Sequence, residues 1–363
     1  MAHSQTLAEL VPQFIQGGHL TSIDTLHGGL INATYLVHLS VEEQQQQLVL
    51  QRVNTAVFTK PELVMANIEK VTKHLRAVAP TARNLHLHPT IDGASYVLDG
   101  EGGLWRAFDY LADCIGHEQV STPAQAYQAG KAFGQFLTQI ADLPPSSLAE
   151  TIPHFHHTPE RLRAFDQACS DYPDRASLIE AELEFIATRR SWISTLEDLR
   201  ERGELPTRTT HNDTKISNVL FDTHTDEAVC VIDLDTVMPG TVLYDFGDLV
   251  RTSVNAAKEA DGIDAVECRM DIFESLAQGY LESAGETLTE VELDHLVFST
   301  KLITIELALR FLTDHLMGDQ YFRTSYAGQN LDRARNQLRL VELLESHEPE
   351  MNEIITRLRD LHI

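Results

Sequence analysis

The residues whose types and spacing best suit chemistry lie in one polar stretch of the chain. The pattern His-x-Asp-x-Lys-x-x-Asn runs from His211 to Asn218, and Asp233 follows the next apolar run. Phosphoryl transfer to a hydroxyl uses such side chains in this order: an Asp accepts the proton, an Asn binds Mg2+, and a later Asp binds Mg2+ against the nucleotide phosphates. The pattern therefore predicts Asp213 as the proton acceptor and Lys215 as a contact of the transferred phosphoryl group. Asn218 and Asp233 are the predicted metal ligands.

A polar turn between two strands is the alternative interpretation of this stretch. Short apolar runs at 219–221 and 229–232 flank the polar segment 222–227, a pattern typical of a β-hairpin. Such a hairpin would place the catalytic loop before its first strand and Asp233 at the exit of its second, so that side chains from both ends could meet in one cleft. Asp235 adds a second carboxylate suited to a hard cation.

A literal Asp-Phe-Gly triplet at 245–247 offers a competing metal ligand. It lies too far beyond Asp213 to follow a single hairpin, and its surroundings look like the start of a helix. We therefore keep Asp233 as the ligand. Asp245 and Asp248 are predicted to be structural acids that brace the catalytic loop.

Length and composition narrow the class of protein. A chain of 363 residues predicts two domains. The net charge of −26 argues against nucleic acid and anionic membranes as partners, since both favour basic surfaces. Four scattered cysteines without a CxxC pair indicate reduced thiols and a cytoplasmic protein. The first twenty residues show no signal-peptide pattern, and no apolar run approaches membrane-spanning length. The sequence leaves monomer and dimer open.

Strand and turn signals dominate the first 110 residues. The predicted elements are a helix at 6–14, strands at 23–26, 33–39 and 48–53, a helix at 61–75, and strands at 96–98 and 105–110. The polar run that contains Gln44–Gln47 is predicted to be a solvated hairpin loop. This order is that of the small lobe of a kinase.

Helical periodicity dominates from residue 123 onward. The predicted helices span 123–140, 159–169, 177–202, 246–257, 265–284, 289–318 and 330–361. The change of pattern predicts an α+β, two-lobed fold: residues 1–110 form a nucleotide-binding lobe with a small antiparallel sheet, and residues 111–363 form a helical lobe with the catalytic loop and substrate pocket. A hinge near Asp109, Tyr110 and Leu111 would offer its backbone to adenine.

A glycine turn and the third strand are the candidate phosphate-binding elements. Gly28 and Gly29 would let the backbone approach phosphates closely, although a plain hairpin turn explains them equally well. Gln51 stands where protein kinases carry a phosphate-binding Lys, and Arg52 beside it faces the other side of the strand unless a bulge intervenes. Glu69 on the following helix is either the acid of that site or part of a solvated helix face.

Together these features resemble the aminoglycoside phosphotransferase and choline kinase superfamily, and more closely the bacterial N-acetylhexosamine 1-kinases. The similar stretches lie between about Leu26 and Gln337: residues 31–37, 50–54, 154–156, 210–220, 232–240, 310–312 and 318–322. The resemblance implies a protein-kinase-like fold with ATP and Mg2+ as cofactors. It also implies phosphorylation of the anomeric hydroxyl of a free hexosamine, giving a sugar 1-phosphate.

The resemblance assigns further residues to the site. Arg310 and Tyr321 match positions that line the sugar pocket, and on one helix they would share a face. The alternative for Arg310 is an ion pair with Glu306, four residues earlier. Leu30 stands where the sugar kinases carry a His, which puts the substrate in question. The residues expected around the nucleotide are Gly28, Gly29, Asn32, Gln51, Arg52, Asp109, Tyr110 and Leu111, with Asn218, Asp233 and Asp235 on the metal.

Other functions stay open at this point. The same fold could phosphorylate another hydroxyl substrate of the choline, homoserine or aminoglycoside type. An inactive nucleotide-binding regulator is the alternative from a different class, and the neutral Gln51 is the one residue that favours it. His154, His156 and His157 have spacing that could chelate zinc, but Thr158-Pro159-Glu160 directly after them predict a helix N-terminus instead.

Overall fold

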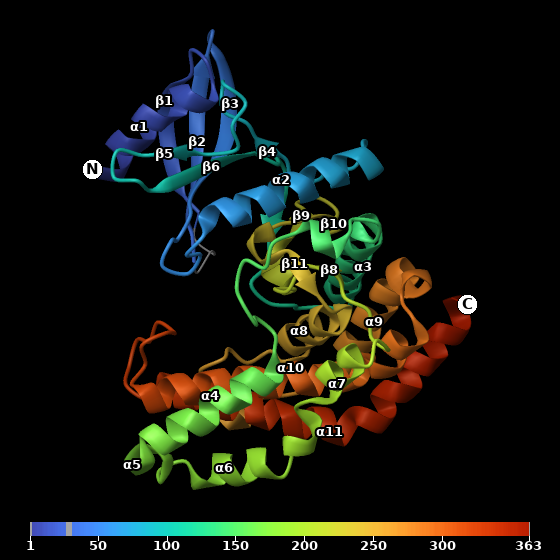
Figure 1. Ribbon diagram of the computed structural model, residues 1–363. Helices are drawn as coiled ribbons and strands as arrows, with labels where there is room; N and C mark the ends of the chain where they lie inside the picture. Colours follow the sequence, from blue (N-terminus) through green and yellow to red (C-terminus); the bar gives the residue numbers. More distant parts are fainter. Residues whose placement is uncertain (1, 27–30, 363) are drawn as a thin grey trace. The chain divides into compact units, whose positions relative to one another are not determined.

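The computed structural model describes residues 2–26 and 31–362, and the chain divides into two compact units (Figure 1). The first unit comprises Met1–Glu118, Asp142–Pro153 and Val219–Pro239. The second comprises Gln119–Ala141, His154–Asn218 and Gly240–Ile363. Each unit is thus assembled from three separate segments of the chain, and the predicted catalytic stretch at 210–218 ends one segment of the second unit.

The first unit is built on an antiparallel sheet in the order β1-β2-β3-β6-β4, with β5 paired to β6. Its strands are β1 His19–Thr25, β2 Ala33–Val41, β3 Gln44–Arg52, β4 Leu87–His88, β5 Val97–Leu98 and β6 Leu104–Asp109. Alternate side chains of β2 point to one face, where they pack with the helix α1 (Ala2–Phe14). This core contains Leu7, Leu10, Val11, Phe14, Tyr35, Val37, Leu39, Leu48, Leu50, Trp105 and Ala107. The predicted strands are confirmed, and β4 was not predicted.

The prediction of a loop at Gln44–Gln47 is wrong. These four residues form the first half of β3, paired with residues 38–41 of β2. The turn uses only Glu42 and Glu43, whose φ angles of 49° and 68° fit a two-residue hairpin turn with both φ positive. Because this short turn closes the hairpin at once, the glutamines pair as a strand while their side chains stay exposed.

The helix α2 (Pro61–Val78) follows the third strand, as predicted. Proline at its start and Glu62 in its first turn suit a helix N-terminus. Val64, Met65, Ile68 and Val71 form its buried face at helical spacing. Glu69 is exposed, which agrees with the solvated-face interpretation of this residue.

A small three-stranded sheet completes the first unit. The predicted hairpin is confirmed as β9 (Val219–Asp222) and β10 (Ala228–Val231), and β7 (Cys114–Gly116) adds an unpredicted third strand against β9. The first unit also contains the 3-10 turns η1 (Pro145–Ser147) and η4 (Leu234–Thr236), and the strand β11 (Met238–Gly240), whose last residue belongs to the second unit.

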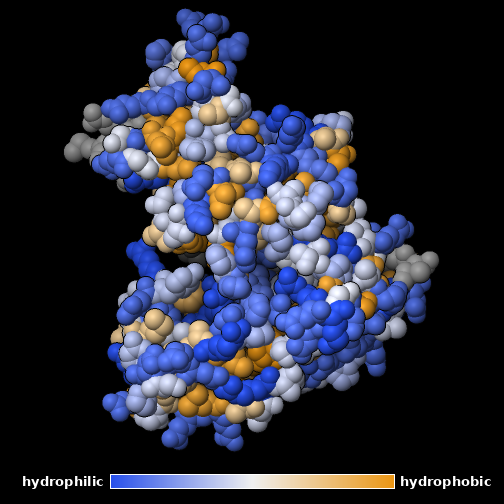
Figure 2. Space-filling view, in the orientation of Figure 1, coloured by the Kyte–Doolittle hydropathy of each residue, from blue (hydrophilic) through white to orange (hydrophobic). Residues whose placement is uncertain are grey.

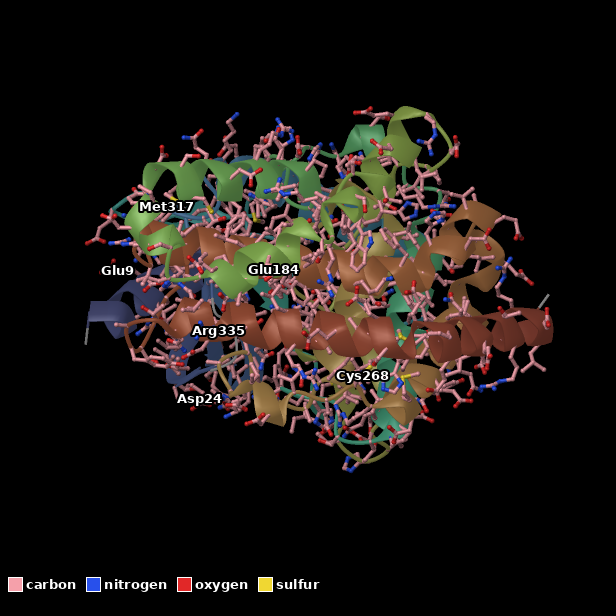
Figure 3. The ribbon with its side chains drawn as sticks, turned by 90° about the horizontal axis from the view of Figure 1, so that it is seen from below. Glu9, Asp24, Glu184, Cys268, Met317 and Arg335 are labelled. Atoms are coloured by element: carbon pink, nitrogen blue, oxygen red, sulfur yellow. The ribbon has the colours of Figure 1, made fainter. Side chains whose placement is uncertain are left out.

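The second unit is helical. Its helices are α3 Pro123–Ile140, α4 Thr158–Asp171, α5 Pro173–Ala176, α6 Glu180–Ala187, α7 Thr195–Glu201, α8 Val242–Val254, α9 Met270–Ala284, α10 Glu290–Met317 and α11 Gln329–His362. The strand β8 (Arg208–Thr210) and the 3-10 turns η2 (Arg190–Trp192), η3 (Ile216–Asn218), η5 (Ile263–Ala265) and η6 (Gly285–Thr287) join them. Figure 3 shows α11 running lengthwise, with Arg335 near α6, where its Nε lies 2.6 Å from Glu182 Oε1.

The single helix predicted at 177–202 is wrong. The chain there is divided into α6, η2 and α7. Arg189 leaves helical geometry with φ −114° and ψ 4°, and its guanidinium bonds both carboxylate oxygens of Glu345 on α11 at 3.1 and 2.7 Å. This tertiary contact outweighs the local helical preference of the segment. The other predicted helices are confirmed within a few residues at their ends.

Figure 2 shows a surface that is largely hydrophilic, with hydrophobic side chains in small groups, as the 54 acidic residues lead one to expect. Within residues 2–26 and 31–362, no helix combines the length and apolar composition needed to cross a membrane.

Candidate active site

The structure brings Asp213, Lys215 and Asn218 together on the loop after β8. Lys215 Nζ lies 2.9 Å from Asp213 Oδ2. The side-chain nitrogen Nδ2 of Asn218 donates to the same oxygen at 3.0 Å and to the main-chain carbonyl of Asp213 at 2.8 Å. One carboxylate oxygen of Asp213 is therefore held by a cation and an amide.

These contacts set the ionisation of Asp213. Burial alone would raise the pKa of its carboxyl, but the charge and hydrogen bond of Lys215 outweigh burial and hold the pKa below its usual range. Asp213 is consequently ionised at neutral pH. An ionised, oriented carboxylate can accept a proton from a hydroxyl placed against it.

Asp245 braces the catalytic loop, as predicted. Its Oδ2 accepts the main-chain N–H of His211 at 2.8 Å, and its Oδ1 accepts that of Asn212 at 2.7 Å. Burial raises the pKa of Asp245 to about 7 in spite of these two backbone bonds. The triplet glycine, Gly247, has a packing role: a Cβ there would lie 2.6 Å from the main-chain oxygen of Ser299. Asp245 thus supports the loop from α8, while Gly247 lets α8 pack closely against α10.

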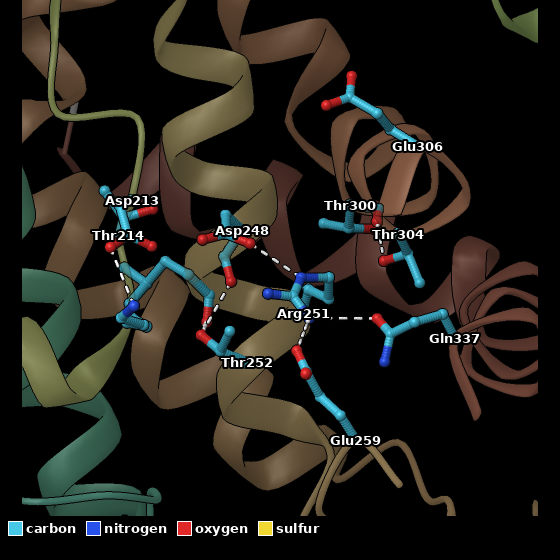
Figure 4. Close-up of polar contacts among 12 residues, drawn as sticks. Asp213, Thr214, Asp248, Arg251, Thr252, Glu259, Thr300, Thr304, Glu306 and Gln337 are labelled. Atoms are coloured by element: carbon cyan, nitrogen blue, oxygen red, sulfur yellow. Dashed lines mark hydrogen bonds and ion pairs between the residues drawn. The ribbon is translucent and has the colours of Figure 1, made fainter. Parts of the chain in front are cut away.

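Asp248 has a different partner from the one predicted. Its Oδ1 accepts from Arg251 Nε at 2.8 Å within α8, rather than from the catalytic loop (Figure 4). Arg251 also reaches Gln337 Oε1 at 3.2 Å and lies 3.5 Å from Glu259. Asp248 therefore anchors a cation that ties α8 to α11.

His156 is a loop-supporting residue that the sequence did not reveal. Its Nε2 lies 2.9 Å from the main-chain oxygen of Asn212, and its Nδ1 lies 2.9 Å from Glu306 Oε1. A carbonyl and a carboxylate both accept, so both ring nitrogens must donate, and the ring is an imidazolium. Burial alone would lower the pKa of His156, but the hydrogen bond to Glu306 raises it above its usual range. The Thr158 hydroxyl donates to the other Glu306 oxygen at 2.7 Å.

Close packing fixes the backbone next to Asp213. Asn212 has a φ of 63°, a conformation that Asn adopts more readily than most residues. A Cβ on Gly240 would lie 2.3 Å from the Thr210 hydroxyl and 2.7 Å from Asn212 Oδ1, so this position requires glycine. The His211 ring meets Phe133 and Phe136 edge-on at 5.4 and 5.6 Å. The loop is thus held from several sides.

Asp233 and Asp235 lie on the turn after β10 in the first unit. Asp233 has φ 62° and ψ 61°, a left-handed conformation that costs a non-glycine residue free energy. Both carboxylate oxygens of the buried Asp235 have partners within the protein. Oδ1 lies 2.5 Å from Arg106 Nη1, and Oδ2 accepts from Asn32 Nδ2 at 2.6 Å. Asp235 is therefore held through both of its carboxylate oxygens. The role of Asp233 as a metal ligand stays a prediction.

Gln51 and Arg52 lie on opposite faces of β3, in a register without a bulge. Gln51 Oε1 accepts twice from Arg106, at 3.0 and 2.8 Å, and its Nε2 donates to Thr34 at 3.1 Å. Arg52 instead lies 3.8 Å from both Asp99 and Glu101. We therefore leave Arg52 out of the proposed nucleotide site.

The remaining predicted nucleotide residues are placed as follows. Asp109 ends β6 and lies 2.7 Å from His88 Nδ1, a hydrogen bond that holds the pKa of its carboxyl below its usual range. Tyr110 and Leu111 follow it directly outside the strand. Gly28, Gly29 and Leu30 lie outside the described residues.

The predicted helical relation between Arg310 and Tyr321 is wrong. The helix α10 ends at Met317, because Gly318 adopts a left-handed φ of 94° and closes it. Tyr321 lies in the following turn, which the Asp314 carboxylate holds through the N–H groups of residues 320–322. Phe322 joins the two: its ring lies 4.8 Å from Tyr321 and 5.5 Å from the Arg310 guanidinium.

Arg310 does not form the ion pair with Glu306 that the four-residue spacing suggested. Both oxygens of Glu306 are engaged by His156 and Thr158. The Arg310 guanidinium lies 5.5 Å from the Phe155 ring as well as from Phe322. Within the described part of the chain, no carboxylate forms an ion pair with it. A guanidinium flanked by aromatic rings is suited to donate to a polar ligand.

The sequence matches the profile of the phosphotransferase enzyme family over residues 22–291, well over half of the chain. The chain belongs to this family. In this phosphotransferase the matched range contains the sheet of the first unit from within β1 onward, the predicted catalytic loop and the turn that carries Asp233.

Solved structures share the fold of this phosphotransferase. An aminoglycoside phosphotransferase from Alicyclobacillus acidocaldarius has a TM-score of 0.64 at 14% identity, covering 94% of this chain and 95% of that one. The microcompartment-associated aminopropanol kinase has a TM-score of 0.59 at 17% identity, with coverage of 96% and 98%. Choline kinase from Cryptosporidium parvum has a TM-score of 0.55 at 11% identity, with coverage of 97% and 99%. The predicted protein-kinase-like α+β fold is confirmed.

Proposed function

We propose that this protein is a small-molecule kinase that transfers a phosphoryl group from MgATP to a hydroxyl, with Asp213 as the proton acceptor. The observation that carries the proposal is the pair of contacts by which Lys215 and Asn218 hold one carboxylate oxygen of Asp213. The loop around it is fixed by Asp245 and His156. A carboxylate held this rigidly costs little reorganisation when the hydroxyl proton moves to it.

The donor types of Asn218 and Asp233 are those that a Mg2+ ion prefers. Asn218 donates to Asp213 through its amide nitrogen, which makes Oδ1 the oxygen it would offer to a cation. Asp233 supplies a carboxylate, and oxygen donors of these two kinds are the usual ligands of Mg2+. When bound, the ion neutralises charge on the phosphates. Asp235 stays outside this ligand set because Arg106 and Asn32 take both its oxygens.

The chain's own residues would act mainly by positioning. Phosphoryl transfer passes through a loose transition state, so alignment and charge neutralisation supply most of the rate acceleration. Asp213 orients the attacking hydroxyl and receives its proton. Lys215 contacts the transferred phosphoryl group. The backbone of residues 109–111 holds adenine.

We propose the anomeric hydroxyl of a free N-acetylhexosamine or related sugar as the acceptor. Arg310 would donate to sugar oxygens, while the Phe155 and Phe322 rings beside it offer apolar faces to the sugar ring. Arg161 adds positive charge nearby: burial and the Arg310 charge lower the pKa of its guanidinium. Two cations favour a neutral or oxygen-rich acceptor over a cationic amino alcohol such as choline.

The test is ADP release from MgATP with a panel of N-acetylglucosamine, N-acetylgalactosamine, other free sugars, choline, homoserine and an aminoglycoside. The proposal expects turnover on a hexosamine, with a product phosphate that is acid-labile and alkali-stable, as an anomeric phosphate is. Turnover on another hydroxyl compound alone would keep the kinase and overturn the sugar assignment. Silence on the whole panel with MgATP bound would favour a nucleotide-binding regulator.

A further inference from the structure

Arg106 carries a buried positive charge in the middle of the sheet of the first unit. It lies on β6 directly opposite Gln51 of β3, and only 1% of it is exposed. Both Nε and Nη2 donate to Gln51 Oε1, and Nη1 lies 2.5 Å from Asp235 Oδ1. A buried guanidinium needs an opposite charge and hydrogen-bond acceptors, and here Asp235 supplies the charge while Gln51 accepts two hydrogen bonds.

The Arg106–Asp235 pair resembles a Lys–Glu ion pair of protein kinases that this sequence lacks. Protein kinases place a Lys on the third strand and pair it with a Glu on the next helix. Here the strand position holds Gln51, and the helix acid Glu69 is exposed. The side chain that α2 presents to the guanidinium is Met65, whose sulfur lies 3.9 Å from Arg106 Nη1. In this protein the cation is Arg106 on the neighbouring strand β6, and its acidic partner is Asp235.

Asp235 connects this cation to two predicted nucleotide elements. Its Oδ2 accepts from Asn32 Nδ2, and Asn32 Oδ1 accepts the main-chain N–H of Asn54 at 2.9 Å. In the sequence Asn32 follows Gly28 and Gly29 by a few residues. Asp235 also lies two residues after Asp233, within the same tight turn. One carboxylate thus ties Asn32 to the turn that carries Asp233.

The left-handed backbone at Asp233 suggests what the Arg106–Asp235 pair does: it helps to hold this turn. Asp adopts a left-handed conformation more readily than most residues but still at some cost in free energy, which contacts around Asp233 offset. Thr151 donates to the carbonyl of Asp235 at 3.3 Å, and Asn67 donates to the carbonyl of Val237 at 3.0 Å, so the turn is anchored after Asp233 along its backbone. The Arg106–Asp235 pair supplies the side-chain anchor.

We propose that Arg106 is a positioning residue for the nucleotide and its metal. Through Asp235 it fixes the Asp233 turn and the Asn32 segment, and its two hydrogen bonds fix the side chain of Gln51 on the third strand. The inference rests on the proposed function, because it assigns the turn of Asp233 to MgATP.

The experiment measures MgATP affinity by calorimetry, at several Mg2+ concentrations, for the wild type, Arg106→Met, Asp235→Asn and the double variant. Each single variant is expected to weaken MgATP binding at least tenfold and to need more Mg2+. The double variant is expected to be no weaker than the worse single one, since the two residues act as a unit. The KM for the hydroxyl acceptor should stay within twofold.

The matched control is Arg189→Met, which removes a two-pronged pair with Glu345 far from these residues in sequence. It should lower the unfolding temperature and leave MgATP affinity unchanged. If Arg106→Met does the same, the inference is wrong and the pair is only structural. If Arg106→Met does not fold, Arg106→Lys replaces it, because Lys keeps the charge but cannot reach both partners. Weaker MgATP binding in Arg106→Lys would support the inference. Unchanged binding would overturn it.

Binding without an acceptor separates this inference from the proposed function. Failure of every acceptor in turnover would sink the proposed activity, while the calorimetric comparison would still decide whether Arg106 positions MgATP. Additive losses in the double variant would show that Arg106 and Asp235 act independently and would also overturn the inference.

Discussion

The Nε2 atom of His156 lies 2.9 Å from the main-chain oxygen of Asn212, the residue directly before Asp213. The same ring bonds Glu306 through Nδ1 and lies 5.2 Å from the Tyr244 ring in a stacked arrangement. A charged ring therefore links α10 to the backbone of the catalytic loop. Support of this kind fixes the direction of the Asp213 side chain without touching a substrate.

The His156–Glu306 pair should make stability depend on pH in a defined way. The raised pKa of His156 contributes stability below its unfolded value near 6.5, which is lost as pH rises through the folded value. The hydrogen bond and charge of His156 outweigh burial and lower the pKa of Glu306, so its contribution is present above about 4.5 and lost as pH falls through the folded value. The pair therefore contributes most to stability between about pH 4.5 and pH 6.5. Asp245 and Asp248 also act on His156, as Arg310 does on Glu306.

The variant His156→Gln isolates this pair from the other titrating groups. It leaves Glu306 buried without its cation, which should cost about 3–5 kcal/mol at pH 6. Urea unfolding of both proteins between pH 4 and 9 would measure the difference, which should shrink toward alkaline pH. The control His347→Gln removes an exposed His–Glu contact on α11 and should change little. A stability difference independent of pH would contradict the charged pair.

Arg310 should govern affinity for the acceptor and not for the nucleotide. Replacement by Met removes a charged donor but keeps much of the aliphatic stem. The expected loss of about 1.5–3 kcal/mol corresponds to a rise in acceptor KM of roughly 10–100-fold, with KM for MgATP unchanged. Arg333→Met is the control, because Arg333 also lies over an aromatic ring, that of Phe311, at 5.6 Å. Equal effects of the two variants on acceptor KM would argue against a direct role for Arg310.

Glycines set the contact between α3 and α9. A Cβ on Gly279 would lie 2.1 Å from the main-chain oxygen of Tyr127, so Gly279→Ala must push the helices apart. We expect a loss of at least about 1–3 kcal/mol in the free energy of unfolding, measured by denaturant titration. Gly285→Ala is the matched control, since nothing lies within 4 Å of its added Cβ. Stability unchanged in Gly279→Ala would contradict this packing.

Local patterns were sufficient for much of the fold. Strand alternation and turn residues located the hairpin after Asn218, and helical periodicity located α10 and α11. The errors arose where a single residue changed the path: two turn residues shortened the hairpin loop before Gln44, and Gly318 ended α10 before Tyr321. Such local stops are weak signals inside a strong periodic pattern.

The supporting residues of the site were harder to foresee for a different reason. The role of Arg106 depends on the strand register that places it opposite Gln51. The role of His156 depends on its contact with Asn212, which is far away in the sequence. Neither relationship leaves a pattern of spacing in the sequence. An Arg inside the apolar run at 104–108 was the one visible hint, because a buried charge demands a partner.

The most direct test of the central claim is the turnover of Asp213→Asn with MgATP and the best hydroxyl acceptor, beside calorimetric MgATP affinity. Asn keeps the shape of the side chain but cannot accept the proton in the same way. We predict a fall in kcat of about 10²–10⁴-fold, with MgATP binding within a few-fold of the wild type. Turnover close to that of the wild type would contradict the assignment of Asp213 as the proton acceptor.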